Sequence, residues 1–265
     1  MKKERLDKIL VELGYFESRE KAKRGIMAGL VFVDGQREDK AGTTFSVDRE
    51  FTVKGADCPY VSRGGLKLAK AIDLWNISLD GATTMDIGAS TGGFTDCMLQ
   101  NGASKVYSID VGYGQLDWKL REDPRVVNIE KCNVRYFECP ELEEQIDFIS
   151  IDVSFISLSH IFPIVKTMLK ENGKTVALVK PQFEAGREQV GKNGIVKDPK
   201  VHEEVIEKII TYARNYGLYP INLSYSPVKG AKGNIEYLLY LEKTLDLSYN
   251  DLCIHEVVMA SHETL

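Results

Sequence analysis

From about residue 62 onward, short apolar runs alternate with segments of helical pattern, and this alternation constrains the fold more than any other feature. Runs that are apolar throughout are typical of strands in a parallel sheet covered by helices on both faces. One helical segment is long: residues 199–217 end at Gly217 and carry an apolar stripe of Val201, Val205, Ile209 and Ala213. The predicted strands are ATTMDI (82–87), KVYSID (105–110), VVNIE (126–130), DFISIDV (147–153), TVALVK (175–180), INLSYS (221–226) and IEYLLYL (235–241). We therefore expect an α/β domain with a seven-stranded, Rossmann-like sheet.

The first 57 residues have a different pattern, typical of a compact α+β module. One helix is predicted over residues 5–14, and a second begins after Ser18, whose hydroxyl can cap it. Short strands are predicted at 30–36, 43–47 and 50–53, with a turn at Asp34-Gly35. The helical side chains expected to face the core are Leu6, Ile9, Leu10, Leu13, Ala22, Ile26 and Met27.

A segment without periodicity, GADCPYV at residues 55–61, separates the two patterns. We predict a module at 1–57, a linker at 58–61 and a larger domain at 62–265. The net charge of the chain is −5, so it presents no global basic field. Residues 1–57 nevertheless hold 12 basic and 11 acidic residues, and REKAKR at 19–24 packs four basic side chains into six positions. Basic character is therefore concentrated in the N-terminal module.

The chain shows no pattern for metals, disulfides or membrane insertion. Its five cysteines are scattered without C-x-x-C spacing, and its four histidines include no H-E-x-x-H pair. The N-terminus MKKERLDKIL is charged, and there is no apolar run of ~18 residues. We expect a cytoplasmic protein with no metal and no membrane partner.

The loop DIGASTGGFTDC, residues 86–97, has three interpretations. Gly88, Ser90 and Gly93 nearly spell the G-x-G-x-x-G dinucleotide turn, with Ser at the middle position. As G-x-S-x-G, the loop could present Ser90 as a nucleophile. The third interpretation is a nucleotide-type turn that binds S-adenosylmethionine (SAM). A phosphate-binding P-loop is excluded, because Phe94 stands where its lysine is required.

The position of the loop argues against a nucleophile elbow, and the missing middle glycine argues against a dinucleotide turn. A nucleophile elbow follows several strands of a hydrolase sheet, whereas this loop ends the first strand, so a triad of Ser90, Asp152 and His202 lacks its scaffold. Asp110 closes the second strand and suits a dinucleotide or SAM equally well, because its carboxylate can accept both ribose hydroxyls. Asn133 follows the third strand, where its amide can bond the adenine edge or simply form a turn.

Four charged residues stand near strand ends or open a helix: Lys67, Asp152, Lys180 and Glu236. Ligands of open α/β sheets bind at the carboxyl ends of strands, so these side chains should share a crevice with Gly88 and Asp110. A ribose 2′-hydroxyl must lose its proton as it attacks a sulfonium methyl group. A buried lysine beside another lysine can take that proton. We therefore predict Lys180 as the base. Lys67 would hold the hydroxyl, and the two acids would orient the lysines.

The N-terminal module resembles the S4-type RNA-binding domain in the patterns R-L-D-x-x-L-x-x-x-G, S-R-x-x-A and I-x-x-G-x-V-x-V-x-G. The resemblance implies that a basic helical surface contacts RNA phosphates, which maps here onto Arg5, Arg19, Lys23 and Arg24.

The larger domain is similar to the TlyA family, once called haemolysin A-like, which joins an S4-type domain to an FtsJ-like (RrmJ-like) methyltransferase domain. The motifs are S-R-G-G-x-K-L, D-I-G-A-S-T-G-G-F-T-D, I-D-V-G-Y-G-Q-L, D-P-R-V, D-x-S-F-I-S-L, L-V-K-P-Q-F-E and G-N-I-E-Y-x-L. The resemblance implies a SAM-dependent methyltransferase fold and 2′-O-methylation of cytidine in ribosomal RNA of one or both subunits. It places a Lys-Asp-Lys-Glu tetrad on Lys67, Asp152, Lys180 and Glu236.

The resemblance also implies the surrounding contacts. The predicted cofactor contacts are Asp86, Gly88, Ala89, Ser90, Gly92, Gly93, Asp110 and Asn133, and the predicted RNA contacts outside the module are Arg63, Arg187, Lys192, Lys229 and Lys232. Phe155 is expected in the SAM or target-base pocket or in the core. Two alternatives remain: an RNA-binding protein of the ribosome that has lost catalysis, and a membrane-damaging haemolysin, for which the sequence offers no inserted segment.

Overall fold

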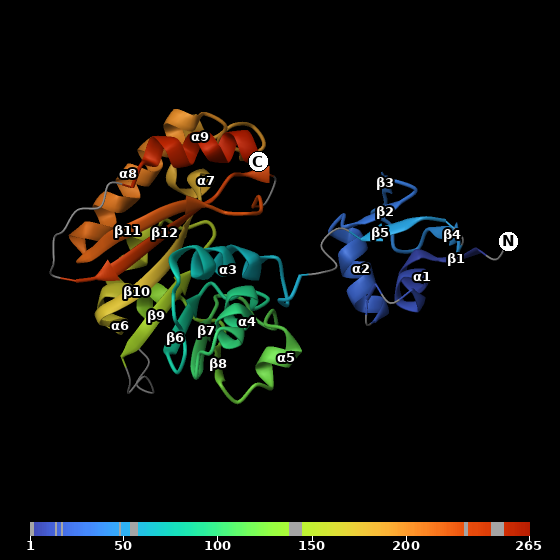
Figure 1. Cartoon of the computed structure of the whole chain (residues 1–265), viewed down its shortest axis with the longest axis horizontal. Helices are drawn as coiled ribbons and strands as arrows, with labels where there is room; N and C mark the ends of the chain where they lie inside the picture. The colour runs from blue at the N-terminus through green and yellow to red at the C-terminus, as the bar shows by residue number, and fades with distance from the viewer. Residues whose placement is uncertain are drawn as a thin grey trace. The chain divides into compact units, whose positions relative to one another are not determined.

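The computed structural model describes residues 3–13, 15–16, 18–47, 49–53, 58–137, 145–230, 233–244 and 252–265. The chain divides into two compact units, Met1–Pro59 and Tyr60–Leu265. Each unit has its own hydrophobic core, and each is described by itself (Figure 1).

The described part of the N-terminal unit folds as two helices and two small antiparallel sheets. The helices are α1 (Leu6–Glu12) and α2 (Arg19–Met27). The strands are β1 (Lys3–Arg5), β2 (Val31–Val33), β3 (Gln36–Arg37), β4 (Thr44–Ser46) and β5 (Phe51–Val53). Strand β1 pairs with β4, while β2 lies between β3 and β5.

Local signals in this unit are confirmed, but two core predictions are wrong. The Ser18 hydroxyl accepts a hydrogen bond from the Lys21 amide at 3.3 Å and caps α2. Leu13 and Met27 were expected in the core, but they are 51% and 73% exposed. Leu13 lies beyond the end of α1, and Met27 is turned about 100° around α2 from the buried Ile26, away from the stripe that packs.

The C-terminal unit is built on a seven-stranded sheet with the order β11-β12-β10-β9-β6-β7-β8. All seven predicted strands are present: β6 (Thr83–Ile87), β7 (Lys105–Ile109), β8 (Val126–Ile129), β9 (Ile146–Ile151), β10 (Leu169–Val179), β11 (Leu218–Tyr225) and β12 (Tyr237–Lys243). Strands β8, β7, β6, β9 and β10 are parallel, and β12 runs antiparallel between β10 and β11. The order reverses at β6, so a crevice forms beside its carboxyl end.

Helices cover both faces of this sheet (Figure 1). On one face, α3 (Gly64–Trp75), α4 (Gly93–Gln100) and α5 (Trp118–Arg121) pack residues such as Leu68 and Met98 into one core cluster. On the other face, α6 (Phe162–Met168), α8 (Pro199–Asn215) and α9 (Ile254–Thr264) contribute Val165, Ile209 and Val258 to a second cluster. A short helix, α7 (Pro181–Glu184), follows β10 directly.

Candidate active site

The loop after β6 takes a backbone path that requires glycine at residue 88. Gly88 has φ +89°, and a Cβ atom there would lie 2.5 Å from the carbonyl oxygen of Asp152. Ser90 and Gly92 also have positive φ, and α4 starts at Gly93. The close approach of β6 and β9 therefore leaves bare backbone facing the crevice, the surface that a nucleotide-like ligand needs.

Asp110, at the end of β7, holds this loop in place. Its Oδ2 accepts a 2.8 Å hydrogen bond from the amide of Ser90, and its Oδ1 accepts a 2.6 Å bond from the amide of Gly112. The Ser90 hydroxyl donates to Oε1 of Gln115 at 3.3 Å. Each carboxylate oxygen keeps a second lone pair, so Asp110 can still accept two ligand hydroxyls.

Asp86 lies beneath the loop and is fully buried. Its carboxylate accepts hydrogen bonds from the hydroxyls of Thr95 in α4, at 2.7 Å, and Ser150 in β9, at 3.2 Å. Burial raises the pKa of Asp86 to about 7, against the opposing effect of these two hydroxyl donors. Asp86 therefore links β6, β9 and α4 from below the crevice.

A cavity of about 340 Å³ opens above the loop. Of the predicted cofactor residues, Gly88, Ala89, Ser90 and Gly93 line it, whereas Asp86, Gly92, Asp110 and Asn133 are not among the described lining residues. The oxygen of Asn133 accepts bonds from the backbone amide and side chain of Arg135, at 3.2 Å each, and so caps a 3₁₀ turn. The remaining lining residues are Ser62, Arg63, Gly64, Lys67, Thr91, Phe94, Asp152, Ser154, Lys180, Val228, Lys229 and Gly230.

Four charged side chains form one connected group beside this cavity. Lys67 lies in α3, Asp152 and Lys180 directly follow β9 and β10, and Glu236 directly precedes β12. Lys67 Nζ donates to Glu236 Oε2 at 2.7 Å and lies 3.7 Å from Asp152 Oδ2. Lys180 Nζ lies 2.5 Å from Asp152 Oδ1. Asp152 therefore bridges the two lysine nitrogens. Both lysines and Glu236 are buried.

Contacts that the sequence patterns did not single out complete this group. Ser154 accepts a 3.0 Å hydrogen bond from Lys180 Nζ, and the Gln182 amide donates to Glu236 Oε1 at 3.5 Å. A Cβ atom on Gly230 would overlap the same Glu236 oxygen, so a larger residue there would displace the Glu236 carboxylate. Ser154 belongs to the D-x-S-F motif, and this membership could have indicated its role from the sequence. Gly230 lies in the loop before β12.

The serine hydrolase interpretation fails on geometry. His202 lies in α8, where its Nε2 donates to the carbonyl of Val196 at 3.0 Å and its Nδ1 lies 2.7 Å from the hydroxyl of Tyr237. Burial lowers the pKa of His202. Among the described contacts, none joins His202 to Ser90 or Asp152, so these three residues form no triad.

Phe155 directly follows Ser154, which lines the cavity, and has a strained conformation. Its side chain is 90% exposed and its φ is +64°, unusual for a bulky residue. The ring packs on Phe183 with centroids 4.9 Å apart, and Lys180 Nζ lies 5.9 Å from the Phe183 ring. Phe155 therefore does not lie in the hydrophobic core, which was one of the predicted locations for it. An exposed, strained aromatic beside reactive groups favours a binding role.

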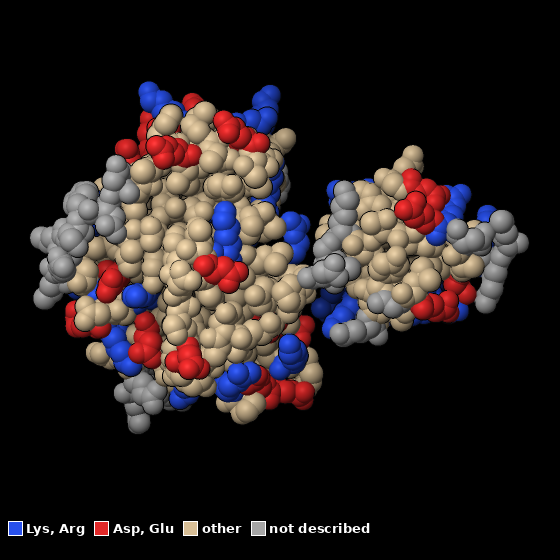
Figure 2. Space-filling view, viewed as in Figure 1, with Lys and Arg blue, Asp and Glu red and all other residues tan. Residues whose placement is uncertain are grey.

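The predicted RNA-contacting residues are exposed wherever the structure describes them. Arg63 and Lys229 line the cavity, and Arg187 and Lys192 lie on the segment between α7 and α8. Lys232 lies outside the described residues. In the N-terminal unit, Lys23 and Arg24 are exposed on α2, and Arg5 and Arg19 both contact Asp7. Figure 2 shows basic side chains scattered among acidic ones on the visible face of each unit.

In the part of the chain that the structure describes, no helix has the length and apolar character needed to cross a membrane.

Comparison with known proteins gives two family matches. The FtsJ-like methyltransferase model matches residues 60–243, and the S4 domain model matches residues 4–50. YqxC of Bacillus subtilis, named as a candidate rRNA methyltransferase, is 54% identical over 91% of this chain and 86% of its own. The 16S/23S rRNA (cytidine-2′-O)-methyltransferase TlyA of Mycobacterium tuberculosis is 39% identical over 91% of both chains. A solved structure of a candidate hemolysin from Streptococcus thermophilus is 51% identical, with a TM-score of 0.80 over 100% of this chain and 97% of that one.

Proposed function

The chain belongs to the FtsJ-like methyltransferases, and within them to the TlyA family, and we propose that it transfers a methyl group from SAM to the 2′-hydroxyl of a cytidine in ribosomal RNA. The observation that carries this proposal is the joining of Lys67, Asp152, Lys180 and Glu236 beside one cavity. We assign RNA binding to residues 1–57 and catalysis to residues 62–265, with a linker at 58–61.

The residues around the cavity fit SAM. Gly88, Ala89 and Ser90 expose backbone to it, and the Asp110 carboxylate beside them can accept two ribose hydroxyls. We assign the adenine end of the ligand to the side of Asn133. When bound, SAM supplies an electrophilic methyl group on a sulfonium.

Lys180 is our candidate for the group that, as a neutral amine, accepts the proton of the 2′-hydroxyl and becomes an ammonium while the oxygen takes the methyl group. Its Nζ is buried and held by Asp152 and by Ser154, which restricts where the nitrogen can lie. Lys67 is tied to Glu236 and faces the same Asp152, so it can donate a hydrogen bond to the hydroxyl oxygen. Fixing the nucleophile in line with the methyl group contributes much of the rate in such a transfer.

Phe155 is our candidate for the surface on which the target base stacks. Phe155 follows Ser154 in the sequence, and its exposed ring packs on Phe183. A base that has left its own stack could therefore stack on this ring. Unstacking a nucleotide costs a few kcal/mol, and stacking on an aromatic side chain recovers part of that cost.

The proposal is tested by methyl transfer from labelled SAM to unmodified small and large ribosomal subunits, assayed separately, with the product nucleotide mapped by mass spectrometry. We expect 2′-O-methylcytidine in at least one subunit. Calorimetric SAM binding, measured on the same preparation, separates the alternatives. SAM binding without transfer to either subunit would contradict the proposal and favour an RNA-binding protein that has lost catalysis.

A further inference from the structure

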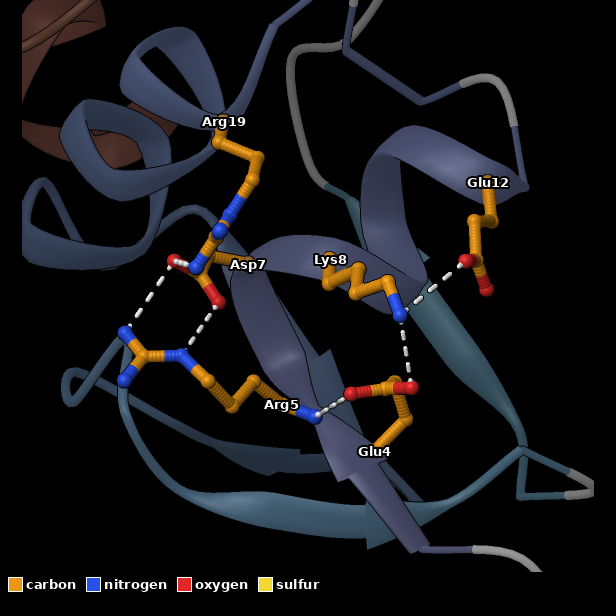
Figure 3. Close-up of polar contacts among 6 residues, drawn as sticks. All are labelled: Glu4, Arg5, Asp7, Lys8, Glu12 and Arg19. Atoms are coloured by element: carbon orange, nitrogen blue, oxygen red, sulfur yellow. Dashed lines mark hydrogen bonds and ion pairs between the residues drawn. The ribbon is translucent and has the colours of Figure 1, made fainter.

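A buried carboxylate in the N-terminal unit holds two of the arginines assigned to RNA binding. Asp7, the second residue of α1, has a side chain with no exposure. Figure 3 shows Arg5, from the end of β1, and Arg19, from the start of α2, converging on it. Arg5 donates from Nε to Oδ1 at 3.0 Å and from its terminal nitrogen to Oδ2 at 3.2 Å, and Arg19 donates to Oδ2 at 2.9 Å.

The two guanidinium groups are held close together but remain open to solvent. A terminal nitrogen of Arg5 and one of Arg19 share a single oxygen of Asp7, so they are separated by no more than two hydrogen-bond lengths. The arginine side chains are 45% and 51% exposed, although their shared partner is not exposed at all. A guanidinium carries five N–H donors, so most of the donors on each arginine remain for an outside acceptor.

The neighbouring Lys8 has a different arrangement. It bonds Glu4 Oε2 at 2.8 Å and lies 3.7 Å from Glu12 Oε1, and these two acids stand four residues before and after it in the sequence (Figure 3). Both acids are themselves partly exposed, so they can compete with phosphate for this lysine. Asp7 cannot compete in this way, because its buried oxygens are covered by the arginines.

We infer that Asp7 is a positioning residue that orients Arg5 and Arg19 as a paired clamp on an RNA phosphate. This inference rests on the proposed function, since it takes ribosomal RNA as the ligand. Orienting two long side chains before binding reduces the rotamer entropy lost on association. Planar guanidinium groups also match the oxygens of a phosphate in a way that ammonium groups do not.

The charge state of Asp7 agrees with this arrangement. Hydrogen bonds from Arg5, and then from Arg19, hold the pKa of Asp7 below its usual range despite burial. The carboxylate therefore stays ionised at neutral pH. The competing hypothesis is that the negative charge of Asp7 repels RNA and weakens binding. It predicts the opposite effect on affinity, because removing the charge would then strengthen RNA binding.

The test measures binding of the full chain to the unmodified ribosomal subunits used in the methyl-transfer assay, at several KCl concentrations. Asp7→Asn keeps the shape and removes the charge. We expect affinity to fall about tenfold, although the protein becomes more positive. The control Glu12→Gln removes an acid of the same helix that contacts Lys8 but neither arginine, and we expect less than a twofold change.

A double-mutant cycle separates positioning from general stability. Arg19→Ala alone should weaken binding and lower the salt slope by about 1. In the Asp7→Asn background the same change should cost less, because the arginine is no longer held. Equal or tighter binding by Asp7→Asn, or the same cost of Arg19→Ala in both backgrounds, would overturn the clamp.

If the thermal melting curve of Asp7→Asn shows that this variant does not fold, a second variant tests the clamp. Arg5→Lys combined with Arg19→Lys keeps both charges and loses the planar groups. We expect weaker binding at an unchanged salt slope, and undiminished affinity would contradict the clamp. If the wild type binds neither subunit and methylates neither, the proposed function itself has failed. If the wild type binds and the variants bind equally well, only the clamp is wrong.

Discussion

Glu236, the residue just before β12, accepts a 2.7 Å hydrogen bond from Lys67 in α3, although 169 residues separate them in the sequence. Both side chains are buried, and Lys67 also faces Asp152. The antiparallel insertion of β12 beside β10 places Glu236 there. The segment that leads into the last strand of the chain thus supplies a carboxylate to a helix that precedes the first strand of the sheet.

The first prediction concerns this pair. Glu236→Gln keeps one acceptor oxygen for Lys67 but removes the charge that holds it, so we expect methyl transfer to fall at least tenfold with little change in Tm. Glu236→Ala leaves a buried lysine short of its partner and should also destabilise the protein by roughly 2 kcal/mol, because Asp152 compensates only in part. Calorimetric melting and initial rates on the same preparations check both. A Glu236→Gln variant with full activity would contradict the orienting role.

The second prediction addresses Lys180. Lys180→Ala should reduce methyl transfer by roughly 10²- to 10⁴-fold, the usual contribution of a positioned acid or base. SAM affinity should be retained, because the loop residues assigned to SAM do not hydrogen-bond to this side chain in the described contacts. Single-turnover rates and calorimetric SAM titration measure the two quantities. Undiminished transfer would remove Lys180 as the base.

The third prediction tests the tight approach at Gly88. A Cβ atom there meets the Asp152 carbonyl at 2.5 Å and the residue must keep φ +89°, so Gly88→Ala should cost at least ~2 kcal/mol and displace Asp152. Gly81→Ala is the matched control. Its φ is also positive, at +69°, but no atom lies within 4 Å, so it should cost only about 1 kcal/mol. Equal shifts in Tm for the two variants would show that the close approach of Gly88 to the Asp152 carbonyl does not contribute to the loss of stability.

The fourth prediction separates stability from function at Phe155. Asn tolerates the left-handed conformation better than Phe, and little apolar area is buried here, so Phe155→Asn should leave Tm unchanged or slightly higher. Methyl transfer to RNA should lose the free energy that one stacked base contributes, about 1–3 kcal/mol. SAM binding serves as the internal control. Loss of Tm together with loss of activity would point to a structural role instead.

The fifth prediction uses the raised pKa of Asp86, about 7. Because the folded-state pKa lies above that of the unfolded chain, near 4, the folded protein binds the proton more readily. Asp86 should therefore lower the stability as pH rises from about 4 to about 7, by a few kcal/mol at most, with no further change above. Asp86→Asn cannot titrate and should melt with a flatter pH profile over this window. Identical profiles for variant and wild type would argue against the buried, proton-binding carboxyl.

Much of the site was predictable because its residues stand in local patterns. Lys180 and Asp152 follow apolar runs that become strands β10 and β9, and Gly88 follows the run that becomes β6. Parallel strands bring their carboxyl ends to one edge, so their proximity followed from the pattern. Ser154 and Gly230 were not singled out, since their importance comes from contacts with Lys180 and Glu236 that no spacing encodes.

The sequence by itself determined the order and type of the elements, the division into two patterns and the chemical identity of the charged groups, because hydrophobic periodicity and turn residues act over a few positions. Only the tertiary structure decided how deep each group lies and which groups meet. It buried Asp86 beneath the loop instead of beside the cavity, exposed Met27, and joined Arg5 to Arg19 through Asp7. These outcomes depend on strand order and on helix packing, which combine distant parts of the chain and leave no local signal.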